Sequence, residues 1–420
     1  MGKPTIRFKG YTDDWEQRKL GDIYGSIGNA FVGTATPYYA EQGHFYLESN
    51  NVKDGQINHN SEIFINDEFY EKQKDKWLHT GDMVMVQSGH VGHAAVIPEE
   101  LDNTAAHALI MFRNPKEEIE PYFLNYEYQT DKTKRKIENI TTGNTIKHIL
   151  ASDMQEFIVD VPKYEEQKEI AGYFCSLDYL ITLHQCKCDQ AKILKKYMLQ
   201  KMFPQNDEKV PKIRFKSFTD DWELRKVTEL LKNSSSAMKI GPFGSALKKE
   251  YFVEEGIKVY AQENAFTGDF SMGDYYITED KYKELKSCEL YPGDLVISMM
   301  GTIGACAIFP KNAEKGIMNS HLLRLQFNNE VIPEYIMYLL RDSVLIRKQI
   351  DRLSVGSIMS GLSSSVVKKL VFPISKLAEQ KRIVEYLDSI DHLITLHQHK
   401  CEELKNIKKF MLQNMFVQEK

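Results

Sequence analysis

The feature that most constrains the fold of this chain is a duplication that runs through its whole length. The hexapeptide LITLHQ occurs at 180–185 and again at 393–398, an offset of 393 − 180 = 213 residues in a chain of 420. The opening IRFKGYTDDWE at 6–16 likewise corresponds to IRFKSFTDDWE at 213–223. Each copy is long enough to bury its own core. The chain is therefore predicted to fold as two related halves.

The two copies do not resemble each other evenly along their length. Their openings and their LITLHQ regions are nearly identical, whereas GDMVMVQSGHVGHAAVIP at 81–98 and GDLVISMMGTIGACAIFP at 293–310 share mainly glycines, a proline and apolar positions. This unevenness favours one scaffold that carries two different surfaces. A purely structural duplication is the alternative, and it would drift more evenly.

Each half is predicted to begin with a mixed α/β domain, which makes the fold class α+β. The runs FYLES, MVMVQ and AAVIP in the first half are bounded by turn residues and predict short strands, with Asp54 and Gly55 as a turn. The segments 121–140 and 332–350 have apolar residues at helical spacing and follow a proline. At least one helix is therefore expected to cover the sheet of each half.

Each half is predicted to end in a long helix. Apolar or small residues recur there at spacings of three and four, the pattern of a coiled-coil seam. The seam residues are Ile170, Phe174, Leu177, Ile181, His184 and Cys188 in the first copy, and Ile383, Leu387, Ile390, Ile394, His397 and Cys401 in the second. Because one helix cannot bury such a narrow stripe alone, the two helices are expected to pair as an antiparallel coiled coil with pseudo-twofold symmetry.

These patterns predict five segments along the chain. They are a first α/β domain at 1–162, a first long helix at 163–203, a linker at 204–212, a second α/β domain at 213–374 and a second long helix at 375–416.

Composition restricts the class of protein. No apolar run approaches the ~18 residues of a membrane span, no apolar segment follows the basic residues of the N-terminus as in a secretory signal, and six scattered cysteines indicate reduced thiols. The expected location is the cytoplasm. A net charge of −5 disfavours a freestanding nucleic-acid binder, although Lys132, Lys134, Arg135 and Lys136 form a local basic segment.

No catalytic constellation is recognisable. A phosphate-binding G-x-x-x-x-G-K-[ST] loop and a G-x-G-x-x-G turn are both missing. The His and Cys residues of the seam have the spacing of a zinc site, but packing within the seam is the better interpretation. Glu166-Gln167-Lys168 has the acid-x-Lys spacing of a nuclease and recurs at 379–381, yet acids in the first turn of a helix favour the helix dipole. No catalytic residue and no metal is predicted.

Two divergent domains, each opened by TDDWE and closed by a helix containing EQK, LITLHQ and K-K-x-M-L-Q-x-M-F, resemble the specificity subunit of type I restriction-modification systems. The resemblance covers essentially the whole chain. It implies a non-catalytic subunit for phage defence, in which two target-recognition domains read a bipartite, asymmetric DNA site and the helix pair sets their spacing. It also implies two methyltransferase subunits that methylate adenine N6, and restriction subunits that cut DNA, so S-adenosylmethionine, ATP and Mg belong to the partners.

Base contacts are expected in glycine-bounded loops, where the backbone can approach DNA and short polar side chains can reach base edges. The candidates in the first domain are Asn50, Asn51, Lys53, Gln87, Ser88, His90, His93, Asn144, Thr145 and Lys147. Those in the second are Gln262, Glu263, Asn264, Met300, Thr302, Ser357 and Ser360, with Lys248 and Lys249 as phosphate contacts. Polar residues that only complete turns are the alternative for many of them. Trp15 and Trp222 recur in equivalent places and are predicted to be core or subunit-packing residues.

Three other functions stay open at this point. The chain could serve a methyltransferase-only complex or be a degenerate orphan specificity protein. It could be a DNA-modifying or DNA-cleaving enzyme in its own right, which would require an acidic metal cluster or a cofactor loop. A purely structural coiled-coil scaffold is disfavoured because the two globular domains take up most of the chain.

Overall fold

The computed structural model describes residues 2–143, 147–205, 208–300, 304–353 and 362–418. The chain forms two compact units. The first unit is Met1–Cys186 with Gln398–Lys420, and the second unit is Lys187–His397. Each unit therefore contains one recognition domain and a part of each long helix. Within the described residues, no helix has an apolar stretch that would span a lipid bilayer.

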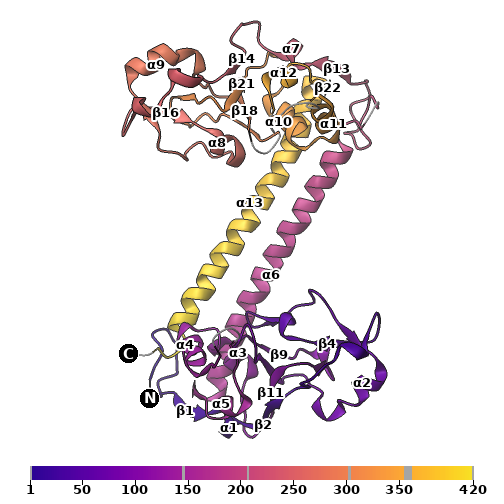
Figure 1. Cartoon of the computed structure of the whole chain (residues 1–420), viewed down its shortest axis with the longest axis vertical. Helices are drawn as coiled ribbons and strands as arrows, with labels where there is room; N and C mark the ends of the chain where they lie inside the picture. Colours follow the sequence, from indigo (N-terminus) through magenta and orange to yellow (C-terminus); the bar gives the residue numbers. More distant parts are fainter. Residues whose placement is uncertain (1, 144–146, 206–207, 301–303, 354–361, 419–420) are drawn as a thin grey trace. The chain divides into compact units, whose positions relative to one another are not determined.

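The first unit is built on two four-stranded sheets, with the orders β2-β11-β8-β9 and β10-β4-β7-β3, together with the pairs β1-β12 and β5-β6. Its strands are β1 (Glu16–Lys19), β2 (Tyr24–Asn29), β3 (Tyr39–Ala40), β4 (His44–Leu47), β5 (Val52–Lys53), β6 (Gln56–Ile57), β7 (Phe64–Ile65), β8 (Met83–Val86), β9 (Ala94–Val96), β10 (Ala105–Ala106), β11 (Leu109–Pro115) and β12 (Ile158–Val161). Its helices are α1 (Leu20–Ile23), α2 (Asp67–Glu71), α3 (Pro121–Glu127), α4 (Asp131–Ile140), α5 (Ala151–Gln155) and the first part of α6 (Tyr164–Lys201). In Figure 1, α3 lies beside β9.

The second unit repeats this plan, with sheets of order β14-β21-β18-β19 and β15-β17-β16-β20 and the pair β13-β22. Its strands are β13 (Glu223–Lys226), β14 (Met238–Ile240), β15 (Phe252–Val253), β16 (Ile257–Tyr260), β17 (Tyr276–Ile277), β18 (Leu295–Ser298), β19 (Cys306–Ile308), β20 (Gly316–Met318), β21 (Leu322–Leu325) and β22 (Val371–Ile374). Its helices are α7 (Val227–Leu230), α8 (Gln262–Thr267), α9 (Glu279–Leu285), α10 (Pro333–Asp342), α11 (Val344–Leu353), α12 (Ser364–Val367) and part of α13 (Leu377–Asn414). The α+β fold class is confirmed.

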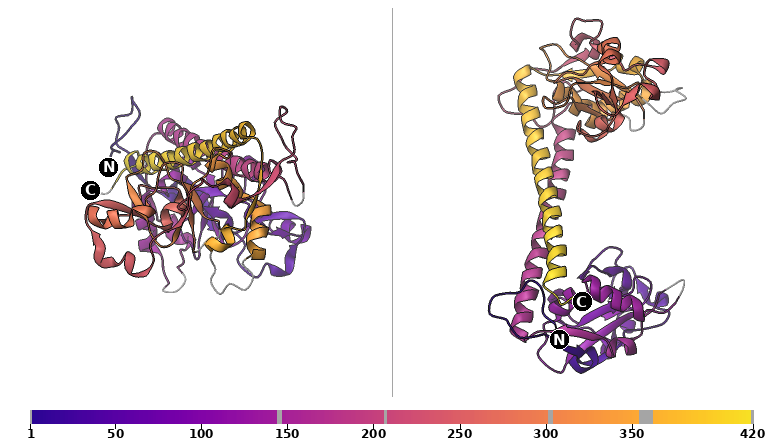
Figure 2. Two further views of the ribbon diagram at one scale, coloured as in Figure 1. Left: turned by 90° about the horizontal axis from the view of Figure 1, so that it is seen from above. Right: turned by 90° about the vertical axis from the view of Figure 1, so that its left-hand side faces the viewer.

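The two long helices pack against each other in both units, and they run antiparallel. In the first unit Lys408 Nζ lies 2.7 Å from Asp178 Oδ1, while Cys401 Sγ lies 4.0 Å from the carbonyl oxygen of Ile181. Residues that come later in α6 therefore contact residues that come earlier in α13, as in an antiparallel pair. Figures 1 and 2 show the two helices side by side.

The second unit contains the equivalent contacts, but here the lysine and the cysteine lie on α6 and their partners lie on α13. Lys195 Nζ lies 2.6 Å from Asp391 Oδ1, and Cys188 Sγ lies 3.9 Å from the carbonyl oxygen of Ile394. Each of these residues is separated by 213 positions from its counterpart in the first unit. Pairing of the long helices was predicted and is confirmed.

The beginning of the seam packs on more than the other helix. Ile170, Phe174 and Leu177 belong to the core of the first unit, and the rings of Phe174 and Tyr126 lie 5.0 Å apart. Ile383 and Leu387 belong to the core of the second unit in the same way. The first turns of each long helix therefore fix it to its own recognition domain, and the helix pair continues from there.

The tryptophans of the TDDWE segments are core residues, as predicted. Trp15 is fully buried and lies edge-to-face with Phe416 at 6.0 Å, while Trp222 lies edge-to-face with Phe203 at 6.2 Å. Phe416 and Phe203 follow the ends of α13 and α6. The start of each copy therefore packs on the helix that comes from the other copy.

Backbone hydrogen bonds fix the same arrangement. The amide of Ile6 donates to the carbonyl of Asn414 at 2.8 Å, and the amide of Ile213 donates to the carbonyl of Lys201 at 2.9 Å. In the first unit this brings the two ends of the chain together (Figure 2).

The EQK segments have a structural role. Glu166 is buried and forms a two-pronged ion pair with Arg7 at 2.6 and 2.7 Å, and Glu379 does the same with Arg214. Gln167, also buried, accepts from the amide of residue 120 and donates to the carbonyl of residue 162. The two glutamates therefore form ion pairs that join the opening segment of each copy to its long helix.

Candidate nucleic-acid interface

The loop at 87–93 connects β8 to β9 and depends on two glycines. Gly89 has a φ of 80° and Gly92 a φ of 88°, values that disfavour residues with a side chain. A β-carbon on Gly92 would also lie 2.9 Å from Cγ2 of Ile137 on α4. The loop is therefore held against α4, and its polar side chains project from a defined backbone.

A second segment, residues 147–149, pairs with this loop. The amide of Gly89 donates to the carbonyl of Lys147 at 3.1 Å, and the amide of Ile149 donates to the carbonyl of Gln87 at 3.0 Å. An antiparallel bridge joins Ser88 to His148. The candidates Gln87, Ser88 and Lys147, distant in sequence, are thereby brought together.

A third segment, the turn between β5 and β6, reaches the loop through His93. The amide of Asp54 donates to Nδ1 of His93 at 3.2 Å, so the ring proton belongs on Nε2. Burial is the main cause that lowers the pKa of His93; the Asp54 carboxylate opposes it, and the charges of His90 and Lys134 add to it. The neutral imidazole therefore keeps one N–H donor for a partner.

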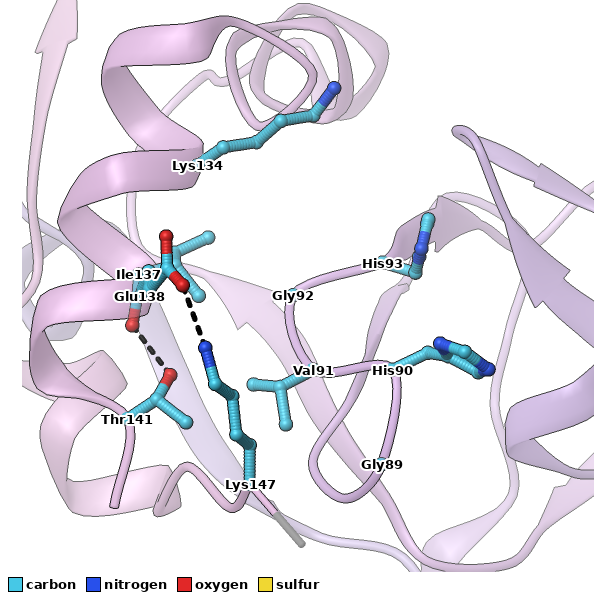
Figure 3. Close-up of a pocket in the computed structure, with 10 residues that line it drawn as sticks. All are labelled: Gly89, His90, Val91, Gly92, His93, Lys134, Ile137, Glu138, Thr141 and Lys147. Carbon is cyan, nitrogen blue, oxygen red and sulfur yellow. Dashed lines mark hydrogen bonds and ion pairs between the residues drawn. The ribbon is translucent and has the colours of Figure 1, made fainter. Parts of the chain in front are cut away.

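The loop at 87–93, Lys147 of the second segment and α4 with the following Thr141 surround a cleft of about 290 Å³ (Figure 3). Figure 3 shows Lys134 on α4 across the cleft from His93. Lys147 Nζ lies 2.7 Å from Glu138 and holds the pKa of that exposed carboxyl below its usual range. The cleft is lined by Gly89, His90, Val91, Gly92, His93, Lys134, Ile137, Glu138, Thr141 and Lys147.

Asn51 and Asn264 occupy equivalent places and have the same internal role. Both are buried, and each amide oxygen accepts from the backbone amide three residues earlier, at 3.0 and 2.9 Å. Each amide nitrogen donates to two carbonyls further along its loop. These side chains complete turns, so they are left out of the interface proposed below. The neighbouring Asn50 and Lys53 are exposed.

The second unit places its candidates around the equivalent loop between β18 and β19. Gly304 has a φ of 84°, and a β-carbon there would lie 3.0 Å from the carbonyl of Leu340 on α10. Met300 is exposed, and its carbonyl accepts from the hydroxyl of Ser298 at 2.8 Å. The candidates Gln262 and Glu263 are half-buried at the start of α8, which packs on β18 and β19.

The remaining candidates are placed as follows. Lys248 and Lys249 are exposed in the turn that precedes β15, where Lys248 lies 3.5 Å from Glu250. Five candidates lie outside the described residues: Asn144, Thr145, Thr302, Ser357 and Ser360.

The basic segment on α4 needs one correction. Lys132 is buried, lies 2.5 Å from Asp160 and donates to the carbonyl of Val417 at 3.0 Å, so it serves the core and not the surface. Lys134 and Arg135 are exposed. Lys134 was not among the candidates, although it belongs to the basic segment and lines the cleft.

Comparisons with known proteins bear on the family of the chain. The family model for the type I restriction modification DNA specificity domain matches twice, at residues 12–192 and 219–406, which together make up most of the chain. The type I restriction enzyme MjaVIII specificity subunit of Methanocaldococcus jannaschii is 22% identical over 410 residues, covering 94% of this chain and 91% of that protein. The putative MjaX specificity subunit of the same organism is 26% identical over 220 residues, covering 50% of this chain and 49% of that protein.

Solved structures show the same fold. The S subunit of the type I restriction-modification system from M. genitalium has a TM-score of 0.64 at 14% identity, with both chains covered completely. A chain from a study of complex assembly and conformational transition in a type I R-M system has a TM-score of 0.52 at 16% identity, covering 97% of this chain and 98% of that one. The chain therefore belongs to the type I restriction-modification specificity family, as a specificity subunit with two copies of the DNA specificity domain.

Proposed function

We propose that the two units read the two halves of a bipartite, asymmetric DNA site, and that the chain directs adenine-N6 methylation and restriction by partner subunits. One observation carries this proposal: equivalent loops on one repeated scaffold present different side chains. The first unit offers QSGHVGH at 87–93, whereas the second offers MMGTIGA at 299–305. Identical loops would suit a palindrome, and unlike loops suit two different half-sites.

The described side chains of the first unit have the chemistry of base readout. His93 keeps a ring N–H donor, Gln87 carries a donor and an acceptor, and Asn50 is exposed on the adjoining turn. Such groups distinguish base pairs by the donor and acceptor pattern of the major groove. In the second unit, the exposed Met300 offers an apolar side chain that suits contact with a thymine methyl group, and the half-buried Gln262 offers a donor and an acceptor.

Exposed apolar residues on the long helices support two copies of one protein partner. Three pairs of them correspond at an offset of 213, and all six side chains are between 36% and 58% exposed. They are Leu180, Ile407 and Phe410 in the first unit, and Leu393, Leu194 and Tyr197 in the second. Large apolar side chains that are exposed close together on a surface favour a protein contact. Two equivalent sets would bind two methyltransferase subunits.

The catalytic groups are assigned to the partners. The methyltransferase subunits would bind S-adenosylmethionine, and the restriction subunits would use ATP and Mg. The acidic Glu166 and Glu379, which have nuclease-like spacing, are occupied by arginine. The complex would act in the cytoplasm, where its DNA lies.

Methylome sequencing tests the function. The chain would be expressed with its neighbouring methyltransferase gene in a host whose DNA is free of methylation, and methylated adenines would be mapped. We expect one motif with two short specified blocks and a fixed unspecified gap. A stable complex that methylates nothing would contradict the proposal and favour an orphan specificity protein. Adenine methylation without restriction would favour a methyltransferase-only complex.

The docking surfaces need their own measurement. Phe410→Glu should remove one methyltransferase subunit from the purified complex, and Tyr197→Glu should remove the other, as measured by native mass spectrometry. Tyr276→Glu, a change on a recognition domain, is the control that leaves both subunits bound. Full assembly of both helix variants would contradict this assignment of the surfaces.

A further inference from the structure

The two units each contain a cleft lined by the same five positions of a long helix. In the first unit Lys405, Lys408, Lys409, Leu412 and Gln413 of α13 line a cleft of about 290 Å³. We call it the first lysine cleft.

In the second unit Lys192, Lys195, Lys196, Leu199 and Gln200 of α6 line a cleft of about 660 Å³, the second lysine cleft. Each of the five residues lies 213 positions before its counterpart and has the same identity. The duplication has therefore kept both the lysines and their position at the edge of a recognition domain.

In each cleft one lysine is largely buried in an ion pair with the other long helix, whereas two lysines are exposed. Lys408 and Lys195 are bound by aspartates and are largely buried, with 13% and 15% of their side chains exposed. Lys405 and Lys409 are exposed and form no ion pair with any described residue. In the second cleft Lys196 is exposed in the same way, and Lys192 lies 3.6 Å from Asp189. Each cleft thus presents two lysines to an anionic partner.

The first lysine cleft continues the recognition cleft. Gly92, His93 and Lys134 line both, so the lysines of α13 lie on the far side of the loop that is the candidate for base readout. Figure 3 labels Lys134 and His93, which line both clefts. A duplex whose bases met this loop would bring its backbone to the same cleft.

We propose that each lysine cleft binds the sugar–phosphate backbone of the half-site read by its own unit, an inference that rests on the proposed function. The backbone is the same for every sequence, so phosphate contacts are expected to be equal in both halves, whereas base contacts must differ. The long-helix residues that line the two clefts are identical, whereas the loops differ. The overall charge of −5 makes these local lysines a concentrated source of positive charge.

The salt dependence of DNA binding tests the proposal. The complex of the chain with its methyltransferase subunits would carry either Lys405→Gln with Lys409→Gln or Lys192→Gln with Lys196→Gln. Its Kd would be measured by fluorescence anisotropy against salt concentration on two duplexes, one cognate and one with both half-sites scrambled. The control is Lys187→Gln with Lys216→Gln, which removes two exposed lysines outside both clefts.

Each cleft variant should lower the slope of log Kd against log salt by about 2, since each phosphate contact contributes about 0.9. Affinity for both duplexes should fall by the same factor, so the ratio between them is kept. Lysine-to-arginine changes at the same positions should retain the slope. A slope equal to that of the control would overturn the proposal.

Two further outcomes are distinguished by the same samples. If the cleft variants lose methyltransferase subunits in size-exclusion chromatography while the control does not, the lysines serve protein docking and the proposal is wrong. If the unmodified complex binds both duplexes equally, the proposed function fails. A reduced slope of the cleft variants on the scrambled duplex would still support the phosphate contacts.

Discussion

Lys408 of the second long helix binds Asp178 of the first, with Nζ 2.7 and 2.9 Å from the two carboxylate oxygens. The hydroxyl of Tyr126 donates to the same carboxylate at 2.9 Å, and Lys408 lies over the Tyr126 ring at 5.1 Å. The second unit repeats the group with Lys195, Asp391 and Tyr338, in which the lysine comes from the first helix and the aspartate from the second. In each unit, the long helix of one copy is thus held by an ion pair to the long helix of the other copy.

Removal of the Asp178 carboxylate should destabilise the first unit. Asp178→Ala leaves Lys408 largely buried without a counter-charge and Tyr126 without its acceptor. We expect a loss of about 2–4 kcal/mol in the free energy of unfolding, measured by urea denaturation. The control is Lys400→Ala, because its pair with Glu403 is exposed and should contribute less than about 0.5 kcal/mol. Equal effects of the two changes would show that the buried pair has no special role.

Replacement of a loop glycine should impair one half-site only. Gly89→Val forces a β-branched residue to a φ of 80°, which costs about 1–2 kcal/mol and moves the loop that carries Gln87 and His93. Discrimination at the half-site read by the first unit should fall, as measured with duplexes substituted in one half at a time.

The matched control for the loop is Gly172→Ala. Gly172 lies within α6, and an added β-carbon meets no heavy atom within 4 Å. This change should leave both half-sites unaffected. Equal loss of discrimination at both half-sites in Gly89→Val would contradict separate readout by the two units.

Substitution of two neighbouring asparagines should distinguish a residue that stabilises a turn from a residue that contacts DNA. Asn51→Ala removes hydrogen bonds to Glu48, Asn58 and Asn60 and should destabilise the loop by about 1–3 kcal/mol. Asn50→Ala should leave stability unchanged and weaken binding to the cognate duplex more than to a scrambled one. Thermal denaturation and anisotropy titrations measure the two effects. If Asn50→Ala bound both duplexes as tightly as the unmodified chain, Asn50 would be removed from the interface.

The repeat was sufficient to predict the scaffold. Glycines, prolines and apolar spacings recur in both copies, so the strands around Gly92 and the long helix through Ile170 could be located without coordinates. The turn at Asp54 and Gly55 was also predicted, and the two residues have φ values of 52° and 85°. Such features depend on local backbone preferences and on burial of one face, both of which leave a periodic pattern in the sequence.

The interface was less predictable, because identical residue types serve different purposes. Asn50 and Asn51 are adjacent, yet one is exposed and the other is consumed by its own loop. Lys132 and Lys134 are two residues apart on α4. Lys132 is buried and paired with Asp160, whereas Lys134 lines a cleft. A polar side chain is buried or exposed according to which distant segment of the chain packs against it. A pattern in a single sequence does not show which distant segment that is.

The buried Glu127 provides a test of how charge is tolerated in the core of the first unit. Burial raises the pKa of Glu127 to about 8, and Oε2 has no hydrogen-bond partner among the described residues. The folded state therefore keeps a proton that the unfolded chain releases above its ordinary pKa of about 4.5. Stability contributed by the protonated form is full below about pH 4.5 and is lost as pH rises toward 8.

Glu127→Gln should remove this pH dependence. The amide is neutral at every pH and can still accept from the amide of Asp160, as Oε1 of Glu127 does at 3.1 Å. The variant and the unmodified chain should have similar free energies of unfolding at pH 5, and the variant should be more stable by on the order of 1–3 kcal/mol at pH 8. Glu138→Gln, at an exposed position, is the control. A constant difference between pH 5 and pH 8 in urea denaturation would mean that Glu127 is ionised in the folded chain, and that Lys132, which already binds Asp160, compensates a second carboxylate.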